Sequence, residues 1–245
     1  MTDAYRDPRL AATYDPLNRW GPGDDFYLGH VMGAASVLDI GCGTGELLSR
    51  ARREGHTGDL AGVDPAPAML AAAKAKRSDV AWYAGDARTL DLSRRFELIL
   101  MTGHAFQALL DDDDVRAALD RFARHLVWGG TLAFETRDPA AKAWEHWTPA
   151  ETSTRVRSAL GEDFTVSHEL LGTREPDLVD FRTAYRSHDT DESFTDDGTL
   201  RFIDPEHLAK LVAASGFVVE NRYGDWDRRP WTAGSPEIVT VATLA

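Results

Sequence analysis

The sequence predicts an α/β protein with a doubly wound, mostly parallel sheet of seven strands. Short apolar runs of strand length alternate with helical patterns through the first 135 residues. The first of these runs ends abruptly in a glycine-rich turn at residues 41–45, which is typical of a strand that enters a tight turn. A later stretch, residues 137–203, alternates apolar and polar side chains one by one and predicts antiparallel strands.

Five strands and three helices are expected before residue 136. The strands are the apolar runs at residues 37–40, 60–63, 80–83, 96–101 and 131–135. Helices with apolar side chains at helical spacing are expected at residues 46–54, 65–76 and 111–126. Gly129-Gly130 is expected to cap the last helix. Strands that alternate with helices in this way form a parallel sheet with right-handed crossovers.

The remaining segments are expected to complete the same domain. Residues 1–30 mix aromatic side chains with prolines and aspartates, and short helical pieces are expected there. In the later alternating stretch, Phe164 and Val166 should share one strand face. The sheet is closed by a helix and two strands, at residues 205–215, 217–223 and 238–243. We expect a single domain over residues 1–245, with an N-terminal cap segment and an antiparallel insertion at residues 137–203.

Composition and charge exclude several classes of partner. Forty acidic and 27 basic side chains give a formal net charge of −13, which repels polyanions, so a nucleic-acid partner is not expected. One cysteine excludes an intramolecular disulfide and a multi-cysteine metal site. No run approaches the roughly 20 apolar residues of a membrane span, and no signal-peptide core opens the chain. We therefore expect a cytoplasmic protein without a membrane partner.

The aspartates at residues 111–114 are expected to have a helical rather than a metal-binding role. Carboxylates at a helix start complement the helix dipole, which accounts for the run without an ion. No metal is expected in this protein.

The glycine turn is the strongest functional signal in the chain. In the dinucleotide fingerprint G-x-G-x-x-G, counted from Gly41 and Gly43, the third glycine position holds Glu46. A carboxylate there repels the pyrophosphate that this helix start should bind. S-adenosylmethionine has no phosphate, so a carboxylate at this position does not argue against it. The turn is also no Walker loop, because no Gly-Lys-Ser/Thr follows it.

Three motifs, each at the end of a predicted strand, resemble those of class I S-adenosylmethionine-dependent methyltransferases. The first is the run from Asp39 to Gly45, Asp-Ile-Gly-Cys-Gly-Thr-Gly. Asp64 matches the acidic residue that binds both ribose hydroxyls in this family, and a carboxylate offers two acceptor oxygens to such a diol. Asp86, in Gly85-Asp86-Ala87, matches the residue that accepts a hydrogen bond from the adenine amino group.

The resemblance covers residues 14–135 well and the last forty residues moderately. It implies a Rossmann-like methyltransferase fold and methyl transfer from S-adenosylmethionine by in-line displacement, with S-adenosylhomocysteine as product. The cofactor-binding residues that it implies are Tyr14, Asp39, Gly41, Cys42, Gly43, Gly45, Asp64, Pro65, Met69, Gly85, Asp86, Ala87, Thr102, Gly103 and His104.

Each aspartate of these motifs also has a purely structural interpretation. Asp39 would then only hold its own turn, Asp64 would be a helix N-cap before Pro65, and Asp86 an ordinary turn aspartate. The sequence leaves these alternatives open.

His104 follows the fourth predicted strand, in the segment that lies beside the reacting methyl group in the family. It is the one titratable side chain in that segment suited to base chemistry near neutral pH. Two roles remain open for it. His104 is either a general base that deprotonates the acceptor or a side chain that contacts the cofactor and lines the cleft.

The insertion at residues 137–203 resembles the substrate cover of small-molecule methyltransferases, including sugar-amine N-methyltransferases and glycine N-methyltransferase. The resemblance implies a small-molecule acceptor with an oxygen, nitrogen or carbon nucleophile. Candidates for the pocket wall are Trp144, Trp147, Trp226 and Trp231, with ordinary loop packing as the alternative for each. The acceptor's identity and the oligomeric state are not readable from the sequence.

Two other functions compete with methyl transfer. A nicotinamide-dependent oxidoreductase uses a similar sheet, although Glu46 and Asp86 both argue against it. A non-catalytic S-adenosylmethionine-binding protein would carry the same motifs, because binding motifs do not establish turnover.

Overall fold

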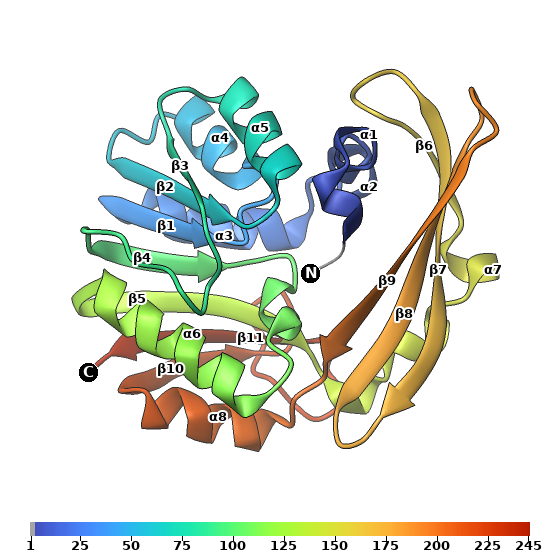
Figure 1. The fold of residues 1–245 in the computed structure, drawn as a ribbon. Coiled ribbons are helices and arrows are strands. Elements are labelled where there is room, and N and C mark those ends of the chain that lie inside the picture. Colours follow the sequence, from blue (N-terminus) through green and yellow to red (C-terminus); the bar gives the residue numbers. More distant parts are fainter. Residues whose placement is uncertain (1–2) are drawn as a thin grey trace.

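Two sheets contain the named strands of the chain that the computed structural model describes, residues 3–245 (Figure 1). The larger sheet is seven-stranded, in the order β10-β11-β5-β4-β1-β2-β3. Its strands are β1 (Ser36–Ile40), β2 (Asp59–Asp64), β3 (Ala81–Ala84), β4 (Phe96–Met101), β5 (Leu126–Arg137), β10 (Phe217–Tyr223) and β11 (Glu237–Leu244). Only β11 runs antiparallel to its neighbours β5 and β10. The predicted doubly wound, mostly parallel sheet is confirmed.

Helices cover both faces of this sheet. On one face, α3 (Pro22–Met32) and α4 (Glu46–Arg53) bury apolar side chains against β1, β4 and β5, and α5 (Pro67–Lys76) lies beside α4. On the other face lie α6 (Asp112–His125) and α8 (Pro205–Ala214). Three fully buried side chains of α6, Val115, Leu119 and Phe122, follow the predicted helical spacing.

The strand order reverses beside β1. The chain proceeds from β1 outward to β2 and β3, and then returns to the other side of β1 with β4. At such a reversal the connecting segments diverge above and below the sheet, which leaves a crevice at the carboxyl ends of the two central strands.

The smaller sheet is antiparallel and follows β5 in the chain. Its strands, in the order β6-β7-β8-β9, are β6 (Thr154–Arg157), β7 (Asp163–Arg174), β8 (Leu178–Ser187) and β9 (Ser193–Arg201). Short helical turns connect it to β5, namely η3 (Pro139–Ala141), η4 (Ala143–His146) and α7 (Pro149–Thr152). Phe164, Val166 and Tyr185 are buried on one face, as the alternation predicts. Figure 1 shows this sheet facing the carboxyl edge of the larger one.

The N-terminal segment lies between the two sheets. It begins with η1 (Asp3–Arg6), α1 (Pro8–Ala11) and α2 (Tyr14–Leu17), the short pieces that the sequence predicts (Figure 1). The helix α3 departs from that prediction because it is a regular element of 11 residues. Its start is stabilised by Pro22 and by Asp24, which accepts a hydrogen bond from the Gly21 N–H at 2.8 Å. The buried Phe26 and Val31 then pack it on the sheet.

The end of α6 also differs from the prediction. The helix stops at His125, and Gly129-Gly130 lies inside β5 instead of capping the helix. The fully buried Leu126 already pairs with Phe96 of β4, and the strand register then shifts opposite residues 127–130. Gly129 has φ +72°, so the two glycines serve a strand irregularity that other residues adopt poorly.

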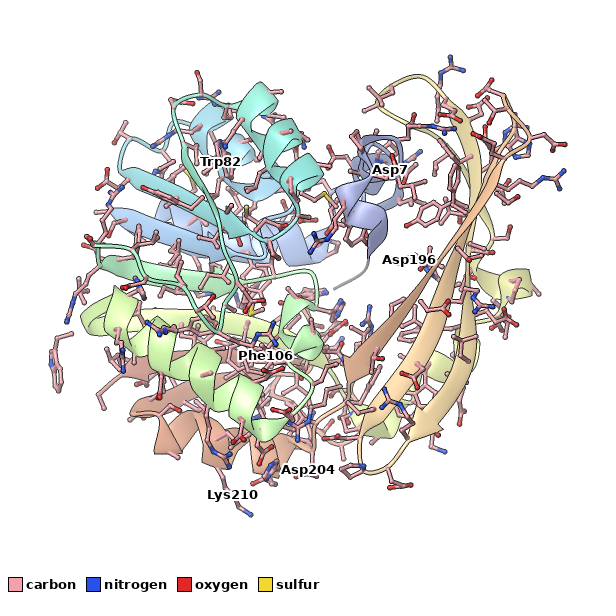
Figure 2. All side chains as sticks on the ribbon, in the orientation of Figure 1. Asp7, Trp82, Phe106, Asp196, Asp204 and Lys210 are labelled. Atoms are coloured by element: carbon pink, nitrogen blue, oxygen red, sulfur yellow. The ribbon has the colours of Figure 1, made fainter. Side chains whose placement is uncertain are left out.

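Gly45 offers a test of how the glycine turn is packed. A Cβ atom at Gly45, which has φ +70°, would lie 2.3 Å from the ring of Trp82, whose side chain Figure 2 labels. Gly55 has φ +95° and open space around it. We expect Gly55→Ala to cost about 1–2 kcal/mol from backbone strain alone. Gly45→Ala should cost a further ~1–3 kcal/mol from overpacking.

Urea denaturation of both variants measures the difference. Equal losses in the free energy of unfolding would mean that Trp82 moves aside without cost and does not constrain the turn.

Candidate functional site

A cavity of about 290 Å³ lies at the carboxyl ends of the central strands. Its lining includes most of the residues that the sequence singles out, namely Tyr14, Gly41, Gly43, Asp64, Pro65, Met69, Gly85, Asp86, Ala87, Thr102, Gly103 and His104. Three of the predicted residues are not among those that line it, namely Asp39, Cys42 and Gly45. Residues from both sheets and from the N-terminal segment therefore surround one space.

A second group of residues also lines the cavity, and the sequence did not predict them. These are Tyr5, Ile40, Arg88, Met101, Ala105, Ala108, Leu109, Arg137, Phe181, Gly198, Thr199 and Leu200. Several belong to β8, β9 and the end of β5, which only the folded chain brings to the crevice.

The glycine loop leaves room for a ligand above its backbone. Gly41 and Gly43 have φ +72° and +52°, a region that favours glycine. A Cβ atom at Gly41 would lie 3.0 Å from the side chain of Ala105, and one at Gly43 would lie 3.6 Å from the ring of Tyr14. The absence of side chains keeps the space open between the loop and Ala105 at Gly41 and between the loop and Tyr14 at Gly43.

Cys42 and Gly45 have packing roles in the same loop. The Cys42 thiol is buried against Gly62, and burial raises the pKa of the thiol well above its usual value. Such a thiol stays protonated and unreactive. Gly45 is the N-cap of α4 and lies under Trp82. Their assignment as cofactor contacts remains a prediction.

Asp64 holds the glycine loop and faces the cavity. Its Oδ2 accepts a hydrogen bond from the Gly43 N–H at 2.9 Å, and its Oδ1 accepts one from the Ala66 N–H at 2.8 Å. The helix α5 starts at Pro67 with Ala66 as its N-cap, so the interpretation of Asp64 as the N-cap is wrong. Each carboxylate oxygen can accept a second hydrogen bond, which leaves capacity for ligand hydroxyls. Burial raises the pKa of Asp64, and the two N–H donors oppose that effect.

Asp86 lines the cavity within an ion pair. Its Oδ1 accepts hydrogen bonds from the backbone and Nε of Arg88, and its Oδ2 accepts from Nη2 at 2.8 Å. Arg88 also contacts Asp114 at 3.0 Å. The Arg88 guanidinium holds the pKa of Asp86 below its usual value, so the carboxylate is charged. The turn role is therefore present, and the adenine contact stays a prediction.

Asp39 is a buried carboxyl group with an incomplete set of hydrogen-bond partners. Its carboxyl is buried, and none of residues 3–245 donates a hydrogen bond to Oδ1. Burial, with smaller contributions from Asp64 and Glu135, raises the pKa of Asp39 to about 8. A cationic group beside the cavity would restore the charged form. S-adenosylmethionine carries an ammonium group, so Asp39 and the open glycine loop fit that cofactor.

His104 is held at the cavity by two carboxylates. It precedes η2 (Ala105–Ala108) with φ +59°, an unusual value for a residue with a side chain. Its backbone N–H donates to Glu135 at 2.6 Å, and its ring Nε2 lies 2.9 Å and 3.0 Å from the oxygens of Glu237. Glu135, itself buried, also accepts a hydrogen bond from the hydroxyl of Tyr27.

The Glu237 contact determines which nitrogen of His104 is free. A carboxylate only accepts hydrogen bonds, so Nε2 donates in this contact, and in the neutral ring Nδ1 is the nitrogen that keeps its lone pair. Within the described chain no side chain or backbone group lies within hydrogen-bond distance of Nδ1. The run Ser235-Pro236-Glu237 resembles that of bacterial small-molecule methyltransferases, but the sequence did not connect Glu237 with His104, because the two lie 133 residues apart.

The N-terminal segment closes one side of the cavity. Lys76 binds Asp15 at 2.6 Å and Glu46 at 3.1 Å, and Asp15 also accepts a hydrogen bond from Thr44. These contacts fasten α2 to the glycine loop. Tyr14 packs edge-to-face with Tyr5 at 5.5 Å, and burial raises the pKa of the Tyr5 hydroxyl to about 12.

The same segment is tied to the smaller sheet. Arg9 binds Glu162 at 2.6 Å and Glu192 at 3.0 Å, while Leu10 packs with Val156 and Phe164. Figure 2 labels Asp196 of β9 on the side that faces the N-terminal helices. The N-terminal helices and the smaller sheet therefore form one continuous cover.

Aromatic side chains near the cavity have mainly structural contacts. Phe106, which Figure 2 labels, is buried and stacks on Phe134 with ring centroids 4.1 Å apart. None of the four tryptophans proposed for the wall lines the cavity. Trp226 packs against Phe26, Trp231 donates to Asp138, and both Trp144 and Trp147 pack against Phe202. The packing alternative describes them, and Phe181 is the aromatic residue that the smaller sheet contributes to the wall.

Two other types of site are absent from the described part of the chain. Within residues 3–245, no three or more His, Cys, Asp or Glu side chains gather closely enough to hold a metal ion. No helix in that range has both the length and the apolar character that crossing a bilayer requires.

Comparisons with known proteins point to one family. Residues 37–130 match a family model described as a methyltransferase domain. A dTDP-3-amino-3,6-dideoxy-alpha-D-glucopyranose N,N-dimethyltransferase from Streptomyces fradiae is 27% identical over 244 residues, which cover 93% of this chain and 91% of the relative. Trans-aconitate 2-methyltransferase from Methylobacterium radiotolerans is 26% identical, covering 85% of this chain and 86% of the relative.

Solved structures agree with the sequence relatives. An amino pentose methyltransferase from Micromonospora echinaspora, solved with S-adenosylmethionine bound, has a TM-score of 0.69 and is 25% identical. That match covers 96% of this chain and 95% of the other. A methyltransferase from Clostridium acetobutylicum has a TM-score of 0.77 at 19% identity, covers 96% of this chain and 98% of its own, and shows the shared fold.

Asp39 is predicted to destabilise the ligand-free protein as pH rises. The ordinary pKa of this carboxyl is 3.8, and in the folded protein it is about 8. Between these two pH values the folded state binds one proton more than the unfolded state. The free energy of unfolding therefore falls with increasing pH across this window. Asp39→Asn removes this contribution and should make the ligand-free protein more stable than wild type at pH 8.5, on the order of 2 kcal/mol.

Thermal and urea unfolding from pH 5 to 9 measure this difference. Asp91→Asn, at an exposed aspartate, is the matched control and should leave the pH profile unchanged. If wild type and Asp39→Asn showed parallel profiles, Asp39 would be ionised in the ligand-free protein.

Proposed function

The chain belongs to the class I S-adenosylmethionine-dependent methyltransferases, and we propose that its acceptor is a small molecule bound beneath the smaller sheet. One observation carries the proposal. A single cavity is lined by the glycine loop and Asp64, by Arg137 and Phe181, and by His104. A cofactor and a small acceptor in that space meet beside His104.

The cofactor supplies a methyl group on a sulfonium, which the acceptor's nucleophile displaces in line to leave S-adenosylhomocysteine. We propose that Gly41 and Gly43 admit the cofactor close to their backbone and that Asp39 binds its ammonium group. Asp64 accepts from the ribose hydroxyls, and Asp86 accepts from the adenine amino group. Tyr14 covers the cofactor from the N-terminal side.

The cover limits what can reach the methyl group. We propose that residues 1–30 and the insertion at residues 137–203 enclose the acceptor within the single domain. Such enclosure excludes water and orients the nucleophile, which supplies much of the rate acceleration in a displacement reaction. This enclosure favours small molecules over polymers. The net charge of −13 also disfavours nucleic acid as an acceptor.

The relatives suggest the range of acceptors. One methylates an amino sugar linked to dTDP, and another methylates trans-aconitate. The proposal for this chain covers oxygen, nitrogen and carbon nucleophiles.

We propose that His104 is the general base when the acceptor's nucleophile carries a proton. As the nucleophile bonds to the methyl carbon and the carbon–sulfur bond breaks, Nδ1 takes the released proton. Glu237 orients the ring through Nε2 and stabilises the charge that the imidazole acquires. Glu135 fixes the backbone of the same residue.

Cofactor binding is the first test. Calorimetry should detect binding of S-adenosylhomocysteine and none of a nicotinamide dinucleotide. Asp64→Asn and Asp64→Ala should each weaken S-adenosylhomocysteine binding by about 1.5–3 kcal/mol, because hydrogen bonds to a charged group are lost. Asp59→Asn, at the other end of β2, is the control and should bind normally. An unchanged dissociation constant in the Asp64 variants would remove the assignment of Asp64.

Turnover distinguishes the enzyme from a protein that only binds the cofactor. Transfer of labelled methyl from S-adenosylmethionine should occur to at least one compound in a panel of amino sugars and carboxylic acids. Binding without transfer to any member would favour a non-catalytic role.

Once an acceptor has been identified, the pH–rate profile tests His104. His104→Asn should abolish the acidic limb of this profile, because the variant lacks the base. Glu237→Gln should lower kcat and leave the affinity for S-adenosylhomocysteine unchanged, since it acts through His104. A His104→Asn profile that retains its acidic limb would show that His104 only lines the cavity.

A further inference from the structure

Arg137 differs from the other buried or cavity-lining arginines of the described chain. It is the last residue of β5, is partly buried and lines the cavity. Arg88 lines the same cavity and pairs with Asp86 and Asp114. Arg201 is buried and pairs with Asp177 and Asp112. For Arg137, by contrast, no carboxylate oxygen among residues 3–245 lies within 4.0 Å of a guanidinium nitrogen, so it forms no ion pair there.

Neutral groups hold the Arg137 guanidinium in place. Its Nη1 donates to the Oε1 of Gln107 at 2.9 Å, and the guanidinium carbon lies 5.6 Å from the ring centre of Trp147. The Nε2 of Gln107 donates to the Arg201 carbonyl at 2.9 Å, which fixes the amide oxygen toward Arg137. A glutamate in place of Gln107 would neutralise the guanidinium, whereas the amide positions it and leaves its charge unbalanced.

The nearest carboxylates are committed elsewhere. Glu237 lies opposite Arg137 in the β5–β11 pairing, but its oxygens bind the ring of His104. Glu135 binds the hydroxyl of Tyr27 and the backbone of His104. Burial lowers the pKa of Arg137, and these two glutamates only partly oppose that effect.

The Arg137 guanidinium therefore retains unused donors beside the cavity. Among residues 3–245 no group accepts a hydrogen bond from its Nε or Nη2. Two adjacent N–H donors of a guanidinium match the two oxygens of a carboxylate or a phosphate. A neutral acceptor would leave this charge without a counter-ion, and a cationic group would be repelled by it.

Arg137 also has the right position for the reaction. In the parallel β4–β5 pair, Met101 lies opposite Phe134. His104 and Arg137 each follow three residues later, so both emerge at the same edge of the sheet. A ligand held by Arg137 is thereby placed next to the proposed base.

We infer that Arg137 binds an oxyanion of the acceptor, so that the acceptor of this enzyme is a carboxylate- or phosphate-bearing molecule. The inference rests on the proposed function, because it names the chemistry of the molecule that receives the methyl group. The sequence alone did not identify the residue, which lies at the boundary between the last predicted parallel strand and the insertion.

The test uses the full chain saturated with S-adenosylhomocysteine and two anionic probes. Trans-aconitate represents carboxylates and thymidine diphosphate represents phosphates, with trimethyl trans-aconitate and thymidine as their neutral counterparts. Calorimetry should detect binding of at least one anion, and the anion that binds identifies the class. Arg137→Gln should weaken that binding about 10- to 100-fold, as expected for the loss of charge-assisted hydrogen bonds.

Two further variants make the result specific. Arg137→Lys keeps the charge without the paired donors and should retain part of the anion affinity. Arg182→Gln removes an equal charge at an exposed ion pair with Asp197 and should leave anion binding unchanged. Normal S-adenosylhomocysteine binding by Arg137→Gln serves as the evidence that this variant is folded.

The outcomes separate this inference from the proposed function. If S-adenosylhomocysteine binds and neither anion does, or if an anion binds wild type and Arg137→Gln equally, the anion site is refuted and the methyltransferase assignment stands. If wild type binds no S-adenosylhomocysteine, the proposed function itself fails, and the inference about the acceptor fails with it.

Discussion

The pairing of β1 with β4 is the constraint on which the rest of the site depends. Parallel strands end at the same edge of a sheet, so this pairing places the glycine loop after β1 beside the His104 turn after β4. The reversal of strand order at the same point leaves a crevice between them. The smaller sheet and the N-terminal helices then close the crevice, held to each other by Arg9 and Leu10. The cavity is thus a consequence of topology.

Two ionisable groups at or next to the cavity lack a full set of partners. Asp39 is a buried carboxyl whose Oδ1 has no donor among residues 3–245, and Arg137 is a guanidinium whose neighbours leave it charged. Groups of this kind lower the stability of the ligand-free protein, because burial without a partner is unfavourable. A ligand that supplies the missing partner recovers that free energy as binding affinity. The opposite signs of the two groups match the cationic cofactor group and the anionic acceptor that we propose for this enzyme.

Carboxylates elsewhere in the site position His104. Glu135 holds its backbone and Glu237 its ring, and the two glutamates come from adjacent strands, β5 and β11. The antiparallel β11 is essential to this arrangement, since its first residue is Glu237. A strand that appears at the very end of the chain therefore completes a site whose motifs all lie in the first half.

The sequence by itself determined the order of strands and helices along the chain, the glycine loop, and the aspartates at the end of β2 and after β3, because these depend on patterns within a few residues. It misplaced the end of α6, because the burial of Leu126 against β4 decides where that helix stops. It also offered tryptophans for the wall, where the fold places Phe181. Only the tertiary structure decided that Glu237 meets His104 and that Gln107, rather than a carboxylate, meets Arg137. Contacts between residues 30 to 133 positions apart depend on strand register and on the path of the insertion, which local patterns do not encode.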